Sequence, residues 1–97
     1  MLNSKQRSTL RGLASVMDPV TQMGKAGINE AFIDGLDKAI EKRELIKFTV
    51  LETAPYSAKE AGLEVAEILG AEFVCAIGRK VVLYRRSLND KVNHIEF

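Results

Sequence analysis

The segment that decides the fold is Leu45-Ile46-Lys47-Phe48-Thr49-Val50-Leu51. Aliphatic, aromatic and β-branched side chains dominate it, and Ile46, Phe48 and Val50 alternate with polar residues. Because successive side chains of a strand point to opposite faces, this alternation predicts a strand with one apolar face. We expect this strand to lie in a sheet that other elements cover.

Amphipathic helices are expected on both sides of this strand. From Asn29 to Arg43, apolar residues recur every three or four positions, and Asn29 is suited to cap the first turn. After the strand, Ser57 and Glu60 have the spacing of a capping box, which opens a helix that runs to Gly70. Its exposed side is acidic.

An earlier helix and a short strand are expected before these elements. Residues 3 to about 17 show helical spacing of apolar side chains. Asp18-Pro19 ends this helix, because a residue before proline avoids the helical conformation. Residues 19–23 are then interpreted as a short strand.

The chain after Gly70 predicts a hairpin. Residues 73–77 and 81–84 are rich in strand formers, and residues 78–80 are a connection short enough to make these strands antiparallel. Residues from about 86 to 97 have the composition of a polar tail. His94 in this tail is the one histidine of the sequence, and it is assigned no role.

Together these segments predict an α/β fold in the order helix, strand, helix, strand, helix, strand, strand. Right-handed crossovers through the helices make strands parallel, and the hairpin adds an antiparallel strand. The expected result is one compact domain over residues 1–97, with a mixed four-stranded sheet covered by helices. The order of the strands in the sheet stays open.

The composition is that of a globular protein. The chain has 97 residues, of which 46% are hydrophobic and 28% charged, and this length supports one core. No apolar run approaches the roughly 20 residues that span a bilayer, so we expect no membrane partner and a cytoplasmic location. The single cysteine, Cys75, lies in an apolar run and is interpreted as a core side chain.

The sequence holds no combination of residues typical of catalysis. No Cys/His cluster suits a metal, no nucleophile stands in a motif with a histidine base, and no longer glycine loop ends in a Walker-type lysine. We therefore expect no enzymatic activity, no cofactor and no metal.

The most informative short motif is the loop Gly24-Lys25-Ala26-Gly27, which precedes the helix that begins near Asn29. Glycine permits positive φ at Gly24 and Gly27, so the main chain can approach a phosphate and direct N–H groups at it. The N-terminus of the helix and the Lys25 ammonium add positive charge. A turn that only joins a strand to a helix needs glycine as well, so the motif alone does not decide for a ligand.

Charge is distributed unevenly along the chain, although the net charge is only +1. Residues 1–28 and residues 73–97 each carry a net charge of +3, whereas residues 29–72 carry −5. If both ends of the chain fold onto the side of the glycine loop, they form one basic face opposite an acidic one. Such a face would orient the molecule on a polyanion.

The candidate residues for contact with a nucleic-acid backbone are the glycine loop and basic side chains elsewhere in the chain. Arg79 and Lys80 lie in the hairpin connection, where charged residues are common even without a ligand. Lys47 could instead be a solvated strand residue, and Arg85 could protect a sheet edge. The full set of candidates is Gly24, Lys25, Ala26, Gly27, Lys5, Arg7, Arg11, Lys47, Arg79, Lys80 and Arg85.

Four segments form a pattern that covers most of the chain. They are Leu10-Arg11-Gly12-Leu13-Ala14, then Pro19-Val20 with Met23-Gly24-Lys25-Ala26-Gly27-Ile28, then Arg43-Glu44-Leu45-Ile46-Lys47-Phe48, and Ile77-Gly78-Arg79-Lys80-Val81-Val82-Leu83-Tyr84-Arg85. In this order they resemble the chloroplast RNA splicing and ribosome maturation (CRM) domain, especially its stand-alone bacterial form, the YhbY-like proteins. One departure is Arg43, because family members often have histidine at that position.

The resemblance implies an α/β RNA-binding domain similar in shape to the C-terminal domain of translation initiation factor three. It implies that residues 24–27 act like the GxxG loop of KH domains. Bacterial members of the family associate with precursors of the large ribosomal subunit, so the implied partner is ribosomal RNA, with ribosomal proteins as further partners. DNA is not an expected partner.

We therefore expect a non-catalytic RNA-binding protein that assists assembly of the large ribosomal subunit. Tyr56 and Tyr84 are the only tyrosines and tryptophan is absent, so recognition by backbone shape is expected rather than stacking on bases. The alternative is a protein-interaction module, in which the acidic helix around residues 60–67 docks a basic ribosomal or assembly partner.

Overall fold

A computed structural model of the chain describes residues 2–89 and 91–97. Its elements follow in the expected order, which confirms the predicted fold class. They are α1 (Ser4–Ala14), β1 (Thr21–Met23), α2 (Glu30–Arg43), β2 (Leu45–Val50), α3 (Ala58–Leu69), β3 (Glu72–Ile77) and β4 (Lys80–Tyr84).

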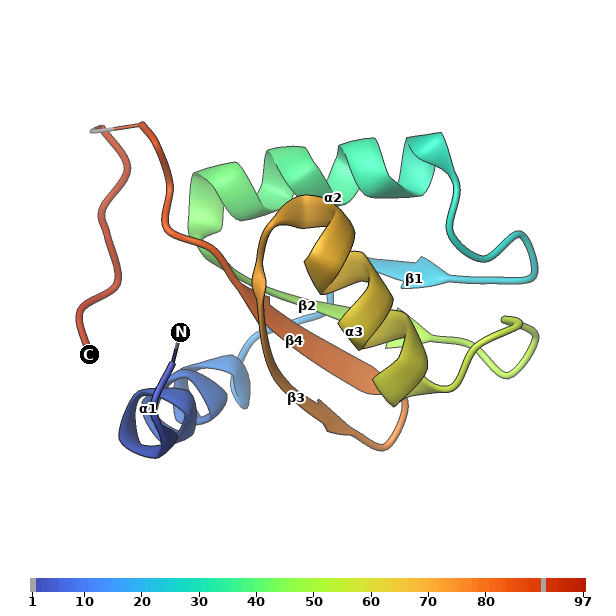
Figure 1. Cartoon of the computed structure of the whole chain (residues 1–97), viewed down its shortest axis with the longest axis horizontal. Coiled ribbons are helices and arrows are strands. Elements are labelled where there is room, and N and C mark those ends of the chain that lie inside the picture. The colour runs from blue at the N-terminus through green and yellow to red at the C-terminus, as the bar shows by residue number, and fades with distance from the viewer. Residues whose placement is uncertain (1, 90) are drawn as a thin grey trace.

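The four strands form one mixed sheet in the order β1-β2-β4-β3 (Figure 1). β1 and β2 are parallel, as expected for strands joined through α2, and β4 is antiparallel to both β2 and β3. The last strand of the chain therefore lies between β2 and β3. This position resolves the strand order that the sequence left open.

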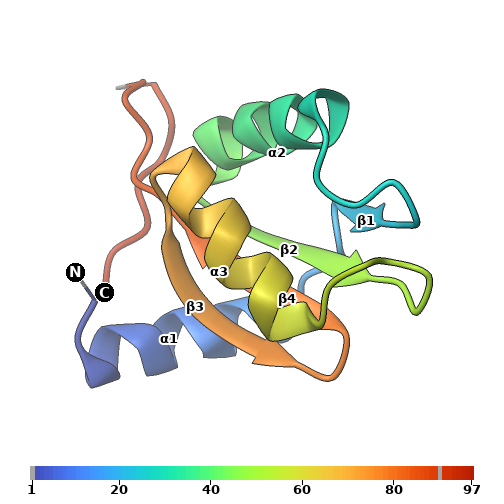
Figure 2. The ribbon, with the colours of Figure 1, turned by 45° about the vertical axis from the view of Figure 1, so that its right-hand side comes forward.

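The helices cover both faces of the sheet. α2 and α3 lie on one face and α1 lies on the other (Figures 1 and 2). The alternation within β2 explains the division, because Phe48 belongs to the core beneath α2 and α3, whereas Leu45 belongs to a smaller core with Leu10 of α1. Where α1 packs, both faces of the sheet are therefore covered. Toward the end of the sheet that carries the β3–β4 connection, the face on the α1 side is left open.

The starts of α2 and α3 are capped by the residues that the sequence indicated. Asn29 accepts a hydrogen bond from the Phe32 amide, and Ser57 and Glu60 form a capping box. Asn3 caps α1 and forms a second capping box with Gln6. Such caps satisfy amides that have no partner within the helix, so each helix begins at a defined residue.

The segment expected to be a polar tail packs against the domain through Glu44. This residue follows α2, has φ 65° and is fully buried. Its carboxylate accepts hydrogen bonds from the Ser87 amide at 2.7 Å and the Ile95 amide at 2.7 Å, and it contacts His94 Nδ1 at 2.5 Å. Burial raises the pKa of the Glu44 carboxyl, but the bonds from His94 and the two amides outweigh it, so the net pKa is lowered.

Candidate nucleic-acid interface

The glycine loop forms a tight turn directly after β1. The Gly27 amide donates to the Gly24 carbonyl at 2.9 Å, which closes the turn, and the Leu51 amide donates to the Met23 carbonyl at 2.9 Å. Lys25 and Ala26 are exposed at the tip. Hydrogen bonds to β2 thus hold the base of the turn, while its tip projects into solvent.

The two glycines of the loop have different roles. Gly27 has φ 67° and is buried, and a Cβ at this position would lie 3.0 Å from Pro55 Cγ. Gly24 does not have positive φ, so that part of the prediction was wrong, and a Cβ there would meet only Leu51 at 3.8 Å. Only the second glycine is required by the backbone conformation and by close packing.

Main-chain donors are available at the tip of the turn. Among the described residues, the amides of Lys25 and Ala26 have no hydrogen-bond acceptor. α2 begins three residues after the turn, and Asn29 occupies only one of its first amides, that of Phe32. Free amides, the positive end of a helix and a lysine therefore occur together, although Glu30 in the first turn of α2 offsets part of this charge.

The β3–β4 connection lies at the same end of the sheet as the glycine loop. The Val50 amide donates to the Arg79 carbonyl at 2.7 Å, next to the point where Leu51 bonds to Met23. Arg79 also pairs with Glu52 at 3.2 Å, whereas Lys80 is exposed and has no ion pair with a described residue. Lys25 and Lys80 are therefore exposed cations of the two loops at this end of the sheet, and neither has an ion pair with another residue of 2–89 and 91–97.

Side chains on the α1 side of the sheet connect these two loops. Gln22 is the cross-strand neighbour of Thr49, Thr49 is the neighbour of Lys80, and Lys80 is the neighbour of Ile77. Directly opposed residues in a sheet point to the same face. These four residues thus form a row across all four strands. The row begins at Gln22, two residues before the glycine loop.

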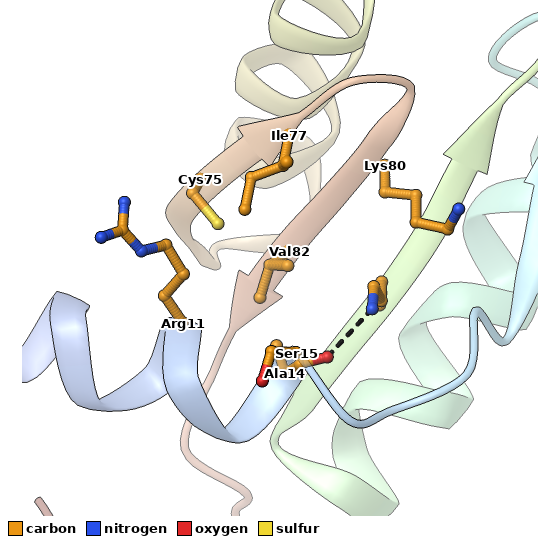
Figure 3. Close-up of a pocket in the computed structure, with 8 residues that line it drawn as sticks. Arg11, Ala14, Ser15, Cys75, Ile77, Lys80 and Val82 are labelled. Atoms are coloured by element: carbon orange, nitrogen blue, oxygen red, sulfur yellow. Dashed lines mark hydrogen bonds between the residues drawn. The ribbon is translucent and has the colours of Figure 1, made fainter.

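The basic residues of α1 lie farther along the same face. Arg7 and Arg11 are one helical turn apart and line a shallow groove with Val74 of β3. Arg11 also borders a second hollow next to Lys80 (Figure 3). Lys5 is exposed, but it lines neither of these hollows.

Lys47 has a structural task. Its ammonium donates to the Ala14 and Met17 carbonyls, at 3.0 Å each. These bonds fix the C-terminal end of α1 to the middle of β2. The side chain is half-buried, at the inner wall of the hollow that Arg11 borders.

Arg85 lies apart from the other candidates. Its side chain is 22% exposed, and its guanidinium pairs with Asp37 at 2.8 Å and donates to the Leu69 carbonyl at 2.8 Å. These contacts join the end of β4 to α2 and α3, on the face opposite α1. We leave Arg85 outside the interface, and its contact with RNA stays an untested prediction.

The two ends of the chain meet, but they do so away from the glycine loop. Leu2 and Ile95 pack against the same small core, and both termini lie at the end of the molecule opposite the loop (Figures 1 and 2). The expected surface is thus only partly formed. Lys25 and Lys80 belong to the two loops at one end of the sheet, and Arg11 borders the hollow beside Lys80, while Lys5 and Arg85 lie elsewhere. α1, which lies on this side of the sheet, contains no acidic residue, whereas α2 and α3 carry most of the acidic side chains.

Two further predictions from the sequence concern membrane-spanning helices and the single cysteine. No helix within residues 2–89 and 91–97 is long and apolar enough to cross a membrane. Cys75, expected in the core, is only half-buried and forms part of the wall of the hollow beside Arg11.

Comparison with known proteins gives a consistent result. The family model of the CRS1/YhbY (CRM) domain matches residues 2–85. YqeI of Bacillus subtilis, named a probable RNA-binding protein, is 34% identical over 91 residues, covering 94% of this chain and 95% of the relative. A Haemophilus influenzae protein named RNA-binding protein is 31% identical over 91 residues, covering 94% of this chain and 92% of its own length.

A solved structure is similar over nearly the whole chain. The solution structure of SAV1595 from Staphylococcus aureus, described as a candidate RNA-binding protein, superposes with a TM-score of 0.79. The two sequences are 41% identical, and the match covers 98% of this chain and 100% of the other. The strand order and the position of α1 are therefore those of a known fold.

Proposed function

Because this chain belongs to the CRS1/YhbY (CRM) domain family, we propose that it is a non-catalytic protein that binds structured ribosomal RNA. Its relatives in Bacillus subtilis and Haemophilus influenzae are named as RNA-binding proteins, which supports RNA as the ligand. Association with a precursor of the large ribosomal subunit, in the cytoplasm, is the finer part of the proposal.

The observation that carries the proposal is the set of donors at the tip of the glycine turn. The amides of Lys25 and Ala26 are free of acceptors among the described residues, and the Lys25 side chain is exposed beside them. An RNA phosphate bound here would accept main-chain hydrogen bonds and neutralise the lysine. The neighbouring Lys80 would contact a further phosphate of the same strand.

Contacts of this kind read the shape of RNA more than its sequence. Tyr84 is 7% exposed and Tyr56 is half-buried, so neither offers an open ring to a series of stacked bases. Phosphate contacts position a protein on RNA without specifying a sequence. A folded ribosomal RNA, in which backbone phosphates approach each other closely, suits this surface better than an extended strand.

The first experiment changes the turn. We expect Lys25→Glu combined with Ala26→Asp to weaken binding to a structured ribosomal RNA fragment at least tenfold, because it places two carboxylates where a phosphate would bind. The measurement is filter binding at fixed salt. Circular dichroism should show an unchanged fold, since both side chains are exposed.

The matched control is Lys42→Glu combined with Asn89→Asp, which changes the net charge by the same amount at exposed positions in the last turn of α2 and in the C-terminal segment. We expect this control to bind RNA as the unchanged protein does. An equal loss of RNA affinity in both double variants would show that the change in net charge alone causes the effect. Unchanged affinity of the turn variant would remove the glycine turn from the mechanism.

The ribosomal part of the proposal has its own test. The tagged protein should cosediment with large-subunit precursors in a sucrose gradient, and sequencing of cross-linked RNA should give a limited number of sites in large-subunit RNA. Cross-links scattered over unrelated cellular RNA would leave RNA binding intact but contradict a role in subunit assembly.

A second candidate function concerns the opposite face. A shallow groove between α2 and α3 is lined by apolar residues, among them Ile33 and Ile68, and by the carboxylates of Glu30, Asp34 and Asp37. A basic ribosomal protein could dock here. Asp34→Lys, which reverses a charge in this groove, should then abolish cosedimentation with precursors while leaving affinity for naked RNA undiminished. Cosedimentation that persists in this variant would exclude the docking function.

A further inference from the structure

A hollow of about 240 Å³ lies on the α1 side of the sheet, beside the glycine end. It is open to solvent where α1 ends and the strands continue past it. Figure 3 shows Arg11 and Lys80 on opposite sides of the hollow, with Val82 between them. Its lining residues are Arg11, Ala14, Ser15, Lys47, Cys75, Ile77, Lys80 and Val82.

The floor of the hollow is apolar. Val82 and Ala14 are buried beneath it, and Cys75 forms part of its wall. Ile77 is 62% exposed at the end of β3, so a large aliphatic side chain lies uncovered at the rim. The side chains of Val82 and Ala14 offer no hydrogen bond to a phosphate, so this part of the floor suits an apolar surface.

The rim is cationic. Arg11 and Lys80 are both exposed, and neither forms an ion pair with a carboxylate of the described residues. The positive charges of the rim also act on Cys75. Burial raises the pKa of its thiol, whereas the nearby charges of Arg11, Arg7 and Lys47 lower it. A ligand with a flat apolar part and an attached anion therefore matches both floor and rim.

The hollow also contains a free hydrogen-bond donor. The Lys47 ammonium carries three N–H groups and uses two of them on the Ala14 and Met17 carbonyls. No described residue accepts from the third. A ring carbonyl oxygen in the hollow could accept this remaining hydrogen bond.

The hollow is continuous with the surface proposed above to bind RNA. Lys80 and Ile77 line the hollow and are the last two residues of the row that starts at Gln22, next to the glycine turn. Adjacent strands are about 4.8 Å apart, so Lys80 lies two strand spacings, about 10 Å, from Gln22. One RNA strand can therefore contact the turn and the hollow at the same time.

We propose that this hollow is the binding site for one unpaired base of the RNA held by the glycine turn. The base would lie on Val82 and Ile77, with the Arg11 guanidinium packed on it and the flanking phosphates on Arg11 and Lys80. The inference rests on the proposed RNA-binding function and adds to it a preference for RNA with a bulged or looped-out nucleotide.

Cys75 provides a test with the unchanged protein, because it is the only cysteine and lies in the wall of the hollow. The probes are an RNA hairpin with one bulged uridine and the same hairpin with an abasic ribose at the bulge. The rate of alkylation of Cys75 by iodoacetamide is measured with each hairpin at saturation, and binding is followed separately by fluorescence anisotropy.

We expect the bulged uridine to slow alkylation at least fivefold and the abasic hairpin to slow it little. We also expect the uridine hairpin to bind about tenfold more tightly, as is typical of one stacked base. Equal alkylation rates with the two bound hairpins would overturn the base site while RNA binding stands. If neither hairpin nor any structured ribosomal RNA fragment binds, the proposed function fails as well.

A pair of variants gives an independent readout. Ile77→Asp places a charge at the apolar rim, and Ile68→Asp makes the same change at a similarly exposed isoleucine of α3, where Ile77 is 62% and Ile68 is 51% exposed. For each variant we compare the affinity for the uridine hairpin with the affinity for the abasic hairpin. The new carboxylate repels the phosphates of both hairpins equally, so this repulsion cancels in the ratio. The ratio should fall to about one in Ile77→Asp and persist in Ile68→Asp. A ratio preserved in Ile77→Asp would contradict the proposal.

Discussion

Gly24 and Gly27 are three residues apart in one turn, yet they differ in what they require of the backbone. Gly27 has φ 67° and leaves no room for a side chain next to Pro55, whereas Gly24 has neither constraint. Glycine thus occurs at these two positions for different physical reasons. The second glycine sets the conformation of the turn, whereas the position of the first has room for a Cβ.

We expect Gly27→Ala to lower the free energy of unfolding by about 2 kcal/mol, because it combines a left-handed conformation with a contact 3.0 Å from Pro55 Cγ. Gly24→Ala is the control and should change it by less than about 0.5 kcal/mol. Urea unfolding followed by circular dichroism measures both. Equal effects of the two substitutions would contradict the distinct roles of these glycines.

Glu44 illustrates what the sequence could not predict at this scale. A glutamate at the end of a charged helix resembles a solvated residue, and no local pattern indicates that it is fully buried. Its partners Ser87, His94 and Ile95 are 43 to 51 residues away in the chain. His94 received no role for the same reason, because its only polar partner is defined by tertiary structure.

The pKa of Glu44 gives a prediction for acid stability. Because the folded-state pKa lies below the ordinary value of 4.5, ionised Glu44 stabilises the fold above that value, and this contribution is lost as the pH falls through the folded pKa. We expect Glu44→Gln to cost about 2 kcal/mol at neutral pH and to reduce the loss of stability on acidification. Urea unfolding at neutral pH and near pH 3 measures this, with Glu64→Gln as the exposed control. An unchanged acid dependence in Glu44→Gln would show that other carboxylates govern it.

At the scale of elements, α1 is attached to the sheet by a small apolar core and by two hydrogen bonds from Lys47. It covers the smaller of the two cores, and Lys47 binds the carbonyls at its C-terminal end. The amphipathic pattern of residues 3–17 predicted the helix but not the face of the sheet that it covers. Lys47 was predictable only as a polar residue of a strand, since its acceptors are 30 and 33 residues earlier.

Removing the Lys47 ammonium should loosen α1 selectively. We expect Lys47→Met to lower stability by about 1–2 kcal/mol, because the two hydrogen bonds are lost while the aliphatic packing is kept. Hydrogen exchange should rise in α1 more than in α2. Uniform acceleration in all three helices would indicate general destabilisation instead of release of α1.

At the scale of the whole molecule, the element order was predictable because caps, prolines and periodic apolar residues are local signals. The strand order was not, since nothing local to residues 80–84 indicates that β4 enters between β2 and β3. The candidate site was predictable in part. The local motif located the turn and the hairpin cations, whereas the hollow beside Arg11 depends on three distant strands and a helix end.

The salt dependence of RNA binding tests the surface as a whole. Lys25, Lys80 and Arg11 are exposed and unpaired among the described residues, so three phosphates neutralised should give a slope of log K against log salt between about −2 and −3. Lys25→Glu should make the slope shallower by about one. A slope near zero would exclude phosphate binding and favour the protein-docking function.

The central place of β4 has a consequence for how the protein is made. β4 is the last strand to be synthesised, and it separates β2 from β3, which are completed earlier. Until residues 80–84 have left the ribosome, the nascent chain has a gap in the middle of its sheet, and both cores lack the side chains that β4 contributes. Folding during translation should therefore be completed late, after β4 has entered between β2 and β3.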